Sequence, residues 1–139
     1  EVRVAVFPGQ SPAEICKEFE AYIADVSARN PFLAKNPPRI SYPGFMQEGY
    51  HLTDADQQEA ILGKCHAEVW GDKLEEHAFA ATTDARPFGL YGNCPTLVYG
   101  PYCRNPHAFD ECVDLESVRK VTKTLALFIA DWCGVEAMR

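Results

Sequence analysis

Two side chains with useful chemistry stand out because of their neighbours in the sequence, a guanidinium at Arg86 and an imidazole at His107. Arg86 closes the run Thr-Asp-Ala-Arg at 83–86, and its planar fork of donors suits bidentate binding of a carboxylate. His107 is followed by Glu111 on the same short stretch, and neutral imidazole is the commonest metal ligand in proteins. We therefore predict that these two side chains face a shared polar cleft.

A tight bend, Tyr99-Gly100-Pro101, lies between these two residues in the chain. Glycine has no Cβ, so the backbone at Gly100 could approach a ligand closely. We predict that Tyr99 and Gly100 contribute to substrate binding, and that Asp84 caps the turn that positions Arg86. An ordinary turn at the end of a strand is the alternative for this bend.

Each candidate residue also has a purely structural interpretation. Arg86 could form an ion pair with Asp84 or Asp110, and His107 could be a solvated loop histidine. A structural zinc site is a further alternative, although its ligand spacing lacks the Cys-x-x-Cys knuckles that identify such sites. The four ligands of that alternative would be Cys94, Cys103, His107 and Cys112.

Composition limits the classes of function. The chain has 139 residues, 47% of them hydrophobic, and a formal net charge of −7. This charge argues against non-specific nucleic-acid binding, which needs a basic surface to neutralise phosphates. No apolar run approaches the roughly 20 residues that a membrane-spanning helix needs. The six cysteines are dispersed, which favours reduced thiols and a cytoplasmic location over a disulfide framework.

Hydrophobic periodicity predicts a mixture of strands and helices. Alternating or short apolar runs indicate strands at 2–7, 39–42, 79–82 and 96–99. Three prolines indicate a loop over 30–38. We place a boundary between two domains, 1–45 and 46–139, because the sequence around 44–53 lacks periodicity.

Three helices are predicted from start and stop signals. The first begins at Pro12 behind a capping box formed by Ser11 and Glu14, the second runs from near Asp54 to Gly71, and the third follows Asp114. The third helix is apolar nearly all round at its end, so we expect it to be buried between layers. Its predicted buried residues are Val118, Val121, Leu125, Phe128, Ile129 and Trp132.

The three motifs, in this order, resemble the C-terminal active-site segment of the zinc-dependent amidohydrolase and exopeptidase family, which includes acetylornithine deacetylase, succinyl-diaminopimelate desuccinylase and aminoacylase. The resemblance covers nearly the whole chain and implies an α/β fold class, present here as an α+β fragment. Residues 1–45 would be half of a β-α-β-β-α-β lid and dimerisation domain. Residues 46–139 would be the C-terminal portion of the catalytic domain.

The resemblance also implies a chemistry for the full-length parent protein. The parent would hydrolyse the amide of an N-acyl amino acid or small peptide with two zinc ions, cobalt being the alternative metal. Arg86, with Tyr99 and Gly100, would bind the substrate, and His107 would ligate one metal with Glu111 and Asp84 in supporting positions. The upstream metal ligands have no match in this sequence, so no catalytic residue is assigned and the fragment alone is expected to be inactive.

Two departures from the family bear on the substrate, because Pro87 replaces a frequent aromatic residue and Tyr102 stands where relatives usually carry a second glycine. A different class of function is the alternative. The strand predicted at 2–7 would have an unpaired edge that invites pairing with a second copy. This edge predicts a homodimer and allows a non-catalytic oligomerisation or binding module.

Overall fold

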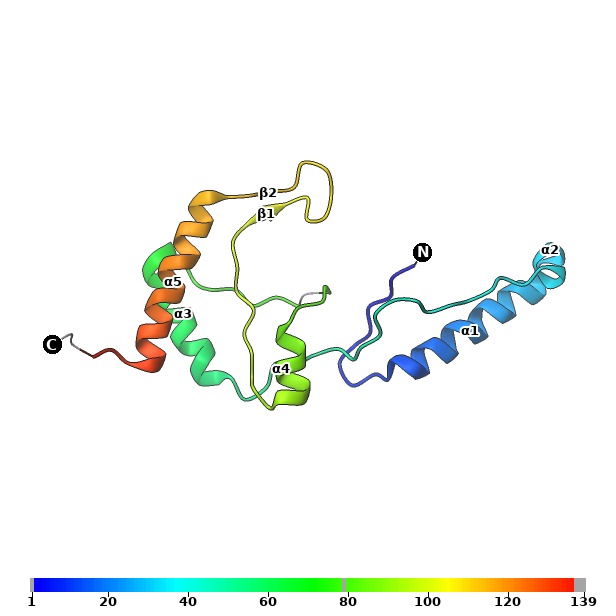
Figure 1. Ribbon diagram of the computed structural model, residues 1–139, viewed down its shortest axis with the longest axis horizontal. Coiled ribbons are helices and arrows are strands. Elements are labelled where there is room, and N and C mark those ends of the chain that lie inside the picture. The colour runs from blue at the N-terminus through cyan, green and yellow to red at the C-terminus, as the bar shows by residue number, and fades with distance from the viewer. Residues whose placement is uncertain (1, 79, 137–139) are drawn as a thin grey trace. The chain divides into compact units, whose positions relative to one another are not determined.

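The computed structural model describes residues 2–78 and 80–136, and the chain divides into two compact units, Glu1–His51 and Leu52–Arg139 (Figure 1). The boundary predicted between residues 45 and 46 lies a few residues before this division. Within the part of the chain that the structure describes, no helix is long and apolar enough to cross a membrane.

Helix α1, Pro12–Arg29, is the main element of the first unit. It begins where the sequence predicts, with Ser11 at the N-cap and Pro12 at the first helical position, where the missing N–H of proline costs nothing. The predicted capping box is wrong in its bonding, because the Ser11 side chain makes no capping hydrogen bond. The backbone oxygen of Ser11 instead accepts from the amides of Glu14 and Ile15, at 3.0 and 3.1 Å.

A short helix, α2 at Pro31–Lys35, occupies the stretch that was predicted to be a loop. The side chain of Asn30 accepts hydrogen bonds from the amides of Phe32 and Leu33, at 3.0 and 3.1 Å. A cap followed by proline at the first helical position is a helix-start signal, and this signal outweighed the loop tendency of the prolines beyond it.

The strands predicted at 2–7 and 39–42 are not formed. The ladder contact of the described part of this unit is an isolated parallel bridge between Pro8 and Gly49. Val2 and Val4 are 76% and 60% exposed, so neither side chain is packed. Period-two alternation creates a strand only where a neighbouring strand supplies ladder hydrogen bonds, and among the described residues of this unit no strand lies beside residues 2–7.

The second unit is built on two helices that pack against each other, α3 at Asp56–Trp70 and α5 at Leu115–Cys133 (Figure 1). Both were predicted from local signals. Helix α3 begins at Asp56, close to the expected start near Asp54, and Ala55 is its N-cap. Its C-cap is Gly71, whose φ of 84° is the left-handed conformation that favours glycine. Helix α5 begins behind Asp114, whose carboxylate accepts the Ser117 amide at 2.6 Å.

The remaining described elements of this unit are helix α4 and a two-stranded hairpin. Helix α4 spans Ala85–Gly92, and strands β1, Cys103–Arg104, and β2, Cys112–Val113, pair antiparallel. The strands predicted at 79–82 and 96–99 are wrong for residues 80–82 and 96–99, which are not in strands, while Phe79 lies outside the described residues. Among the described residues of this unit, β1 and β2 pair with each other, and residues 80–82 and 96–99 have no strand beside them to complete a ladder.

The core lies between α3 and α5 and is small and partly polar. Leu62, Cys65 and Val121 are buried there together with Thr124, which is 0% exposed. The expectation that α5 is buried all round is wrong for three residues, and their exposed fractions are 38% for Leu125, 58% for Ile129 and 44% for Trp132. Helix α5 therefore carries an exposed apolar face besides the one that packs on α3.

Candidate functional site

Arg86 is presented by a helix and not by the end of a strand. It is the second residue of α4, its amide donates to the Thr83 oxygen at 3.4 Å, and its side chain is half-buried. Asp84 occupies the N-cap position of that helix, as a capping residue should, but its side chain makes no capping hydrogen bond. Asp84 is therefore correctly placed by the sequence, while its predicted capping bond is wrong.

His107 lies on the loop between β1 and β2, and its side chain is exposed. Its backbone is in the left-handed region, with φ of 62°, and so are those of Asn105 at 54° and Asp110 at 59°. This region is uncommon for residues other than glycine and is enriched in Asn, Asp and His. The loop that carries the imidazole is thus held in a tightly turned conformation.

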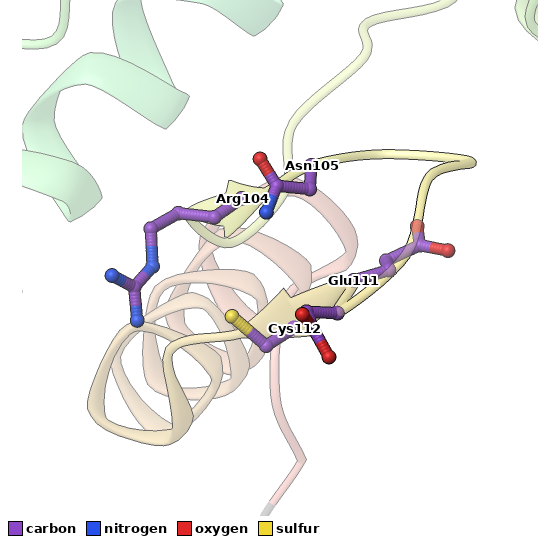
Figure 2. Close-up of a pocket in the computed structure, with 5 residues that line it drawn as sticks. Arg104, Asn105, Glu111 and Cys112 are labelled. Carbon is purple, nitrogen blue, oxygen red and sulfur yellow. The ribbon is translucent and has the colours of Figure 1, made fainter.

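An open pocket of about 500 Å³ lies on the same hairpin. Figure 2 shows the side chains of Arg104 and Cys112 on one side of the two-stranded ladder, as expected for residues that are direct partners in it. The residues that line the pocket are Arg104, Asn105, Asp110, Glu111 and Cys112. Of the predicted site residues only Glu111 is among them, so a cleft shared by Arg86 and His107 stays a prediction.

Metal ligation needs several donors that converge. Across residues 2–78 and 80–136, no three His, Cys, Asp or Glu side chains are grouped so that they could hold a metal ion. The alternative zinc site is disfavoured by register as well, because Cys103 faces Val113 while Cys112 faces Arg104, which places the two cysteines on opposite faces of the ladder. All six cysteines are free thiols.

A buried polar network in the second unit was not predicted. His66, only 8% exposed, lies on α3 with its Nε2 3.0 Å from Asp72 Oδ1 and its Nδ1 2.8 Å from the Tyr99 hydroxyl. The Trp70 ring stacks on His66 with centroids 5.2 Å apart, and its Nε1 donates to Thr124 Oγ1 at 3.3 Å. Tyr99, predicted to touch substrate, is thereby tied to both helices of the core.

The segment that contains the predicted bend is fixed at its other end as well. The Tyr102 amide donates to Ser117 Oγ at 3.0 Å, and its carbonyl accepts from the Asp114 amide at 2.9 Å. The Tyr102 and Trp70 rings also form a T-shaped pair, with centroids 5.5 Å apart. Gly100 lies between these anchors, and a Cβ built on it would meet nothing within 4 Å. The space beside Gly100 is therefore open, and its role in binding a ligand stays a prediction.

One sequence signal could have revealed this network. His66 lies on the same face of α3 as Leu62 and Val69, at helical spacings of four and three residues. A polar residue inside an apolar stripe must find hydrogen-bond partners when it is buried. Its partner Tyr99 lies 33 residues away in the sequence, so the identity of that partner was beyond local reasoning.

Two pKa values on α3 depart from their ordinary range. Burial raises the pKa of the Cys65 thiol, because the charged thiolate is poorly solvated there. The hydrogen bond from Lys64 to Asp131 raises the pKa of that lysine, and the two atoms lie 2.8 Å apart. Both side chains of this ion pair are largely exposed, so its contribution to stability is small.

Comparison with known proteins gives one informative similarity. The chain is similar to N-formyl-4-amino-5-aminomethyl-2-methylpyrimidine deformylase of Halalkalibacterium halodurans, with 24% identity over 141 aligned residues that cover 95% of this chain and 33% of that protein. The chain thus spans about a third of the length of the curated relative it matches. No protein-family model matches the sequence.

Proposed function

We propose that this chain is the substrate-binding, C-terminal part of a hydrolase that removes an acyl group from a nitrogen atom. The observation that carries the proposal is the similarity, over 95% of the chain, to an enzyme named as a deformylase of an N-formyl amine. The deformylase name agrees with the amide chemistry that the Arg86, Tyr99-Gly100-Pro101 and His107 motifs imply. N-acyl amino acids and small peptides are the substrate class that these motifs favour.

The roles of the chain's own residues follow from their chemistry. The guanidinium of Arg86 would bind the carboxylate of the substrate in bidentate fashion, which orients the scissile amide. The open side of Gly100 would admit the substrate against the backbone. Pro87 follows Arg86 within α4, so the substrate would meet a smaller apolar surface there than an aromatic residue provides.

We assign no complete metal site to the described residues. His107 is exposed and offers one imidazole, and the described residues include no group of three donors around it. A two-zinc centre of the kind the family resemblance implies would need its other ligands from outside this chain. The proposal therefore assigns to this chain substrate binding and at most one metal ligand.

Zinc titration by calorimetry tests this division of roles. We expect the chain to bind fewer than two zinc ions per molecule, and to bind them weakly. The substitution His107→Ala should abolish this weak binding, whereas His77→Ala should leave it unchanged. His77 is a matched control because it is exposed and lies in the same unit. Two tight zinc sites per chain would contradict the proposal, since a complete centre would then exist here.

A second candidate function is an oligomerisation module. The predicted edge strand at 2–7 is not formed, but Val2 and Phe7 are each 76% exposed, and α5 exposes Ile129 and Trp132. Within each unit, exposed apolar groups of this size favour association when neighbouring groups form a contiguous surface. Size-exclusion chromatography coupled to light scattering tests this second function. A stable dimer would support an oligomerisation module, and a monomer at all concentrations would exclude it.

A further inference from the structure

The Tyr99–Tyr102 segment is anchored to the core at both ends, and the anchor at Tyr99 depends on a histidine that no sequence motif includes. Tyr102 is fixed through its backbone to Ser117 and Asp114, at the start of α5. Tyr99 is fixed through its hydroxyl, which lies 2.8 Å from His66 Nδ1 and 3.5 Å from Thr124 Oγ1. The Gly100-Pro101 bend lies between these two anchored residues.

Donor and acceptor capacity determines which nitrogen of a neutral His66 ring carries the hydrogen. A carboxylate only accepts hydrogen bonds, so the contact between Asp72 Oδ1 and His66 Nε2 places the ring hydrogen on Nε2. In the neutral ring Nδ1 is then an acceptor, and the Tyr99 hydroxyl must donate to it. A phenol has a single hydrogen, and the 2.8 Å separation from His66 is shorter than the 3.5 Å separation from Thr124.

The surroundings of the ring support this assignment. Thr124 already accepts from Trp70 Nε1 at 3.3 Å and donates to the Lys120 oxygen at 3.0 Å, so its hydroxyl is satisfied without Tyr99. Trp70 stacks on the His66 ring within 12° of parallel and restricts its rotation. Asp72 is 70% exposed at the end of α3, so the carboxylate stays hydrated while it orients the ring.

We propose that His66 is a positioning residue: Asp72 fixes its Nε2–H tautomer, and the free Nδ1 then holds the Tyr99 hydroxyl and with it the Gly100-Pro101 bend. The role in ligand binding rests on the proposed function, because that function makes the bend a substrate-binding backbone. The fixed tautomer and the Tyr99 anchor stand on the contacts alone. In this scheme His66 acts only through Tyr99.

The first test is the nitrogen-15 spectrum of the full chain with labelled histidine. The expected result is a His66 ring protonated at Nε2 with an unprotonated Nδ1, which Asp72→Asn should convert to a mixture of tautomers. A His66 ring protonated at Nδ1 in the unaltered chain would overturn the proposal, since Nδ1 could not then accept from Tyr99.

The second test separates the two bonds of the ring with near-isosteric variants. His66→Asn keeps an acceptor close to the Nδ1 position, whereas His66→Gln keeps a donor close to the Nε2 position. Hydrogen exchange at the Tyr102 amide reports opening of the segment, because that amide donates to Ser117. We expect exchange roughly fivefold faster in His66→Gln and in Tyr99→Phe, the factor that corresponds to one lost hydrogen bond, and a smaller change in His66→Asn.

The combination of His66→Gln with Tyr99→Phe completes a double-mutant cycle. The double variant should exchange no faster than either single variant, because both remove the same bond. His77→Gln is the matched control, since its ring is 75% exposed and pairs only with the exposed Glu75 among the described residues. The proposal would be overturned if the exchange rate of the Tyr102 amide were unchanged in His66→Gln, or if it rose equally in His66→Gln and His66→Asn. It would also be overturned if the double variant exchanged faster than either single variant by the product of their two factors.

These measurements need no substrate and no metal. A failed amide-hydrolysis proposal would leave the tautomer and the exchange pattern unchanged, and a failed positioning proposal would leave the roles of Arg86 and His107 to be tested separately. If His66→Gln does not fold, the His66 tautomer in the unaltered chain and the Tyr102 exchange rate in Tyr99→Phe still test whether His66 anchors Tyr99.

Discussion

At the scale of the residue, Gly71 and Gly100 differ in what their backbones require. Each has open space where a Cβ would lie, but Gly71 has φ of 84° and Gly100 does not adopt a left-handed conformation. We expect Gly71→Ala to lower the free energy of unfolding by about 1 kcal/mol, since a side chain strains that conformation. Gly100→Ala should change it by less than about 0.5 kcal/mol.

Thermal unfolding of the two variants makes this comparison. An equal loss of stability in both would show that Gly100 is needed for folding, and would remove the reason to assign it to ligand binding. If Gly100→Ala is as stable as the unaltered chain, any loss of substrate binding in that variant arises from the added methyl group at the bend.

Cys65 offers a second residue-scale prediction, because burial raises the pKa of its thiol above the ordinary value of 9.0. The thiolate is the reactive form, so at mildly alkaline pH Cys65 should be alkylated more slowly than the other five cysteines. The stabilisation from the protonated thiol is complete below the pKa of the unfolded chain and is lost as pH rises through the folded pKa. Mass spectrometry after timed iodoacetamide treatment measures the alkylation rate of each cysteine. The slower rate at Cys65 should disappear in denaturant.

At the scale of the element, the two core helices give a matched pair of leucines. Leu62 on α3 is 5% exposed and Leu125 on α5 is 38% exposed. Leu62→Ala should lower the free energy of unfolding by about 2–4 kcal/mol, because it leaves a cavity, whereas Leu125→Ala should lower it by less than about 1 kcal/mol. Denaturant unfolding measures both. A large loss for Leu125→Ala would mean that its face of α5 is covered in solution by another surface.

Helix termini were predictable because their signals are local. Pro12, Gly71 and Asp114 act within one turn of their own position, and each lies where the sequence placed it. The capping box at Ser11 and the cap at Asp84 failed in detail, since the residue type permits a side-chain bond without ensuring its rotamer.

Strands and burial were less predictable because they depend on partners. Runs such as 2–7 and 96–99 have strand-like sequences, but a ladder needs a second strand that the sequence does not identify. The apolar end of α5 likewise predicted burial, which requires a layer on each side. The candidate site shows the same pattern: Arg86 and His107 were found from motifs, whereas the His66 network rests on contacts between distant residues.

At the scale of the whole molecule, two observations bear on the proposal that this chain forms one part of a hydrolase. The chain covers 33% of the deformylase to which it is similar, and its α5 exposes an apolar face. Such a face can pack against another surface.

Binding of the substrate carboxylate by Arg86 is tested most directly by comparing kcat/KM for an N-acyl amino acid and for its carboxamide analogue, in the full-length protein that contains this chain. Lysine cannot reproduce the bidentate fork, so Arg86→Lys should lower kcat/KM for the acid by roughly tenfold to hundredfold.

The same substitution should change kcat/KM for the carboxamide much less, and Arg119→Lys, an exposed control on α5, should change neither. A selective loss for the acid is the expected result. Equal losses for acid and carboxamide, or no hydrolysis of either substrate by the full-length protein, would contradict carboxylate binding by Arg86.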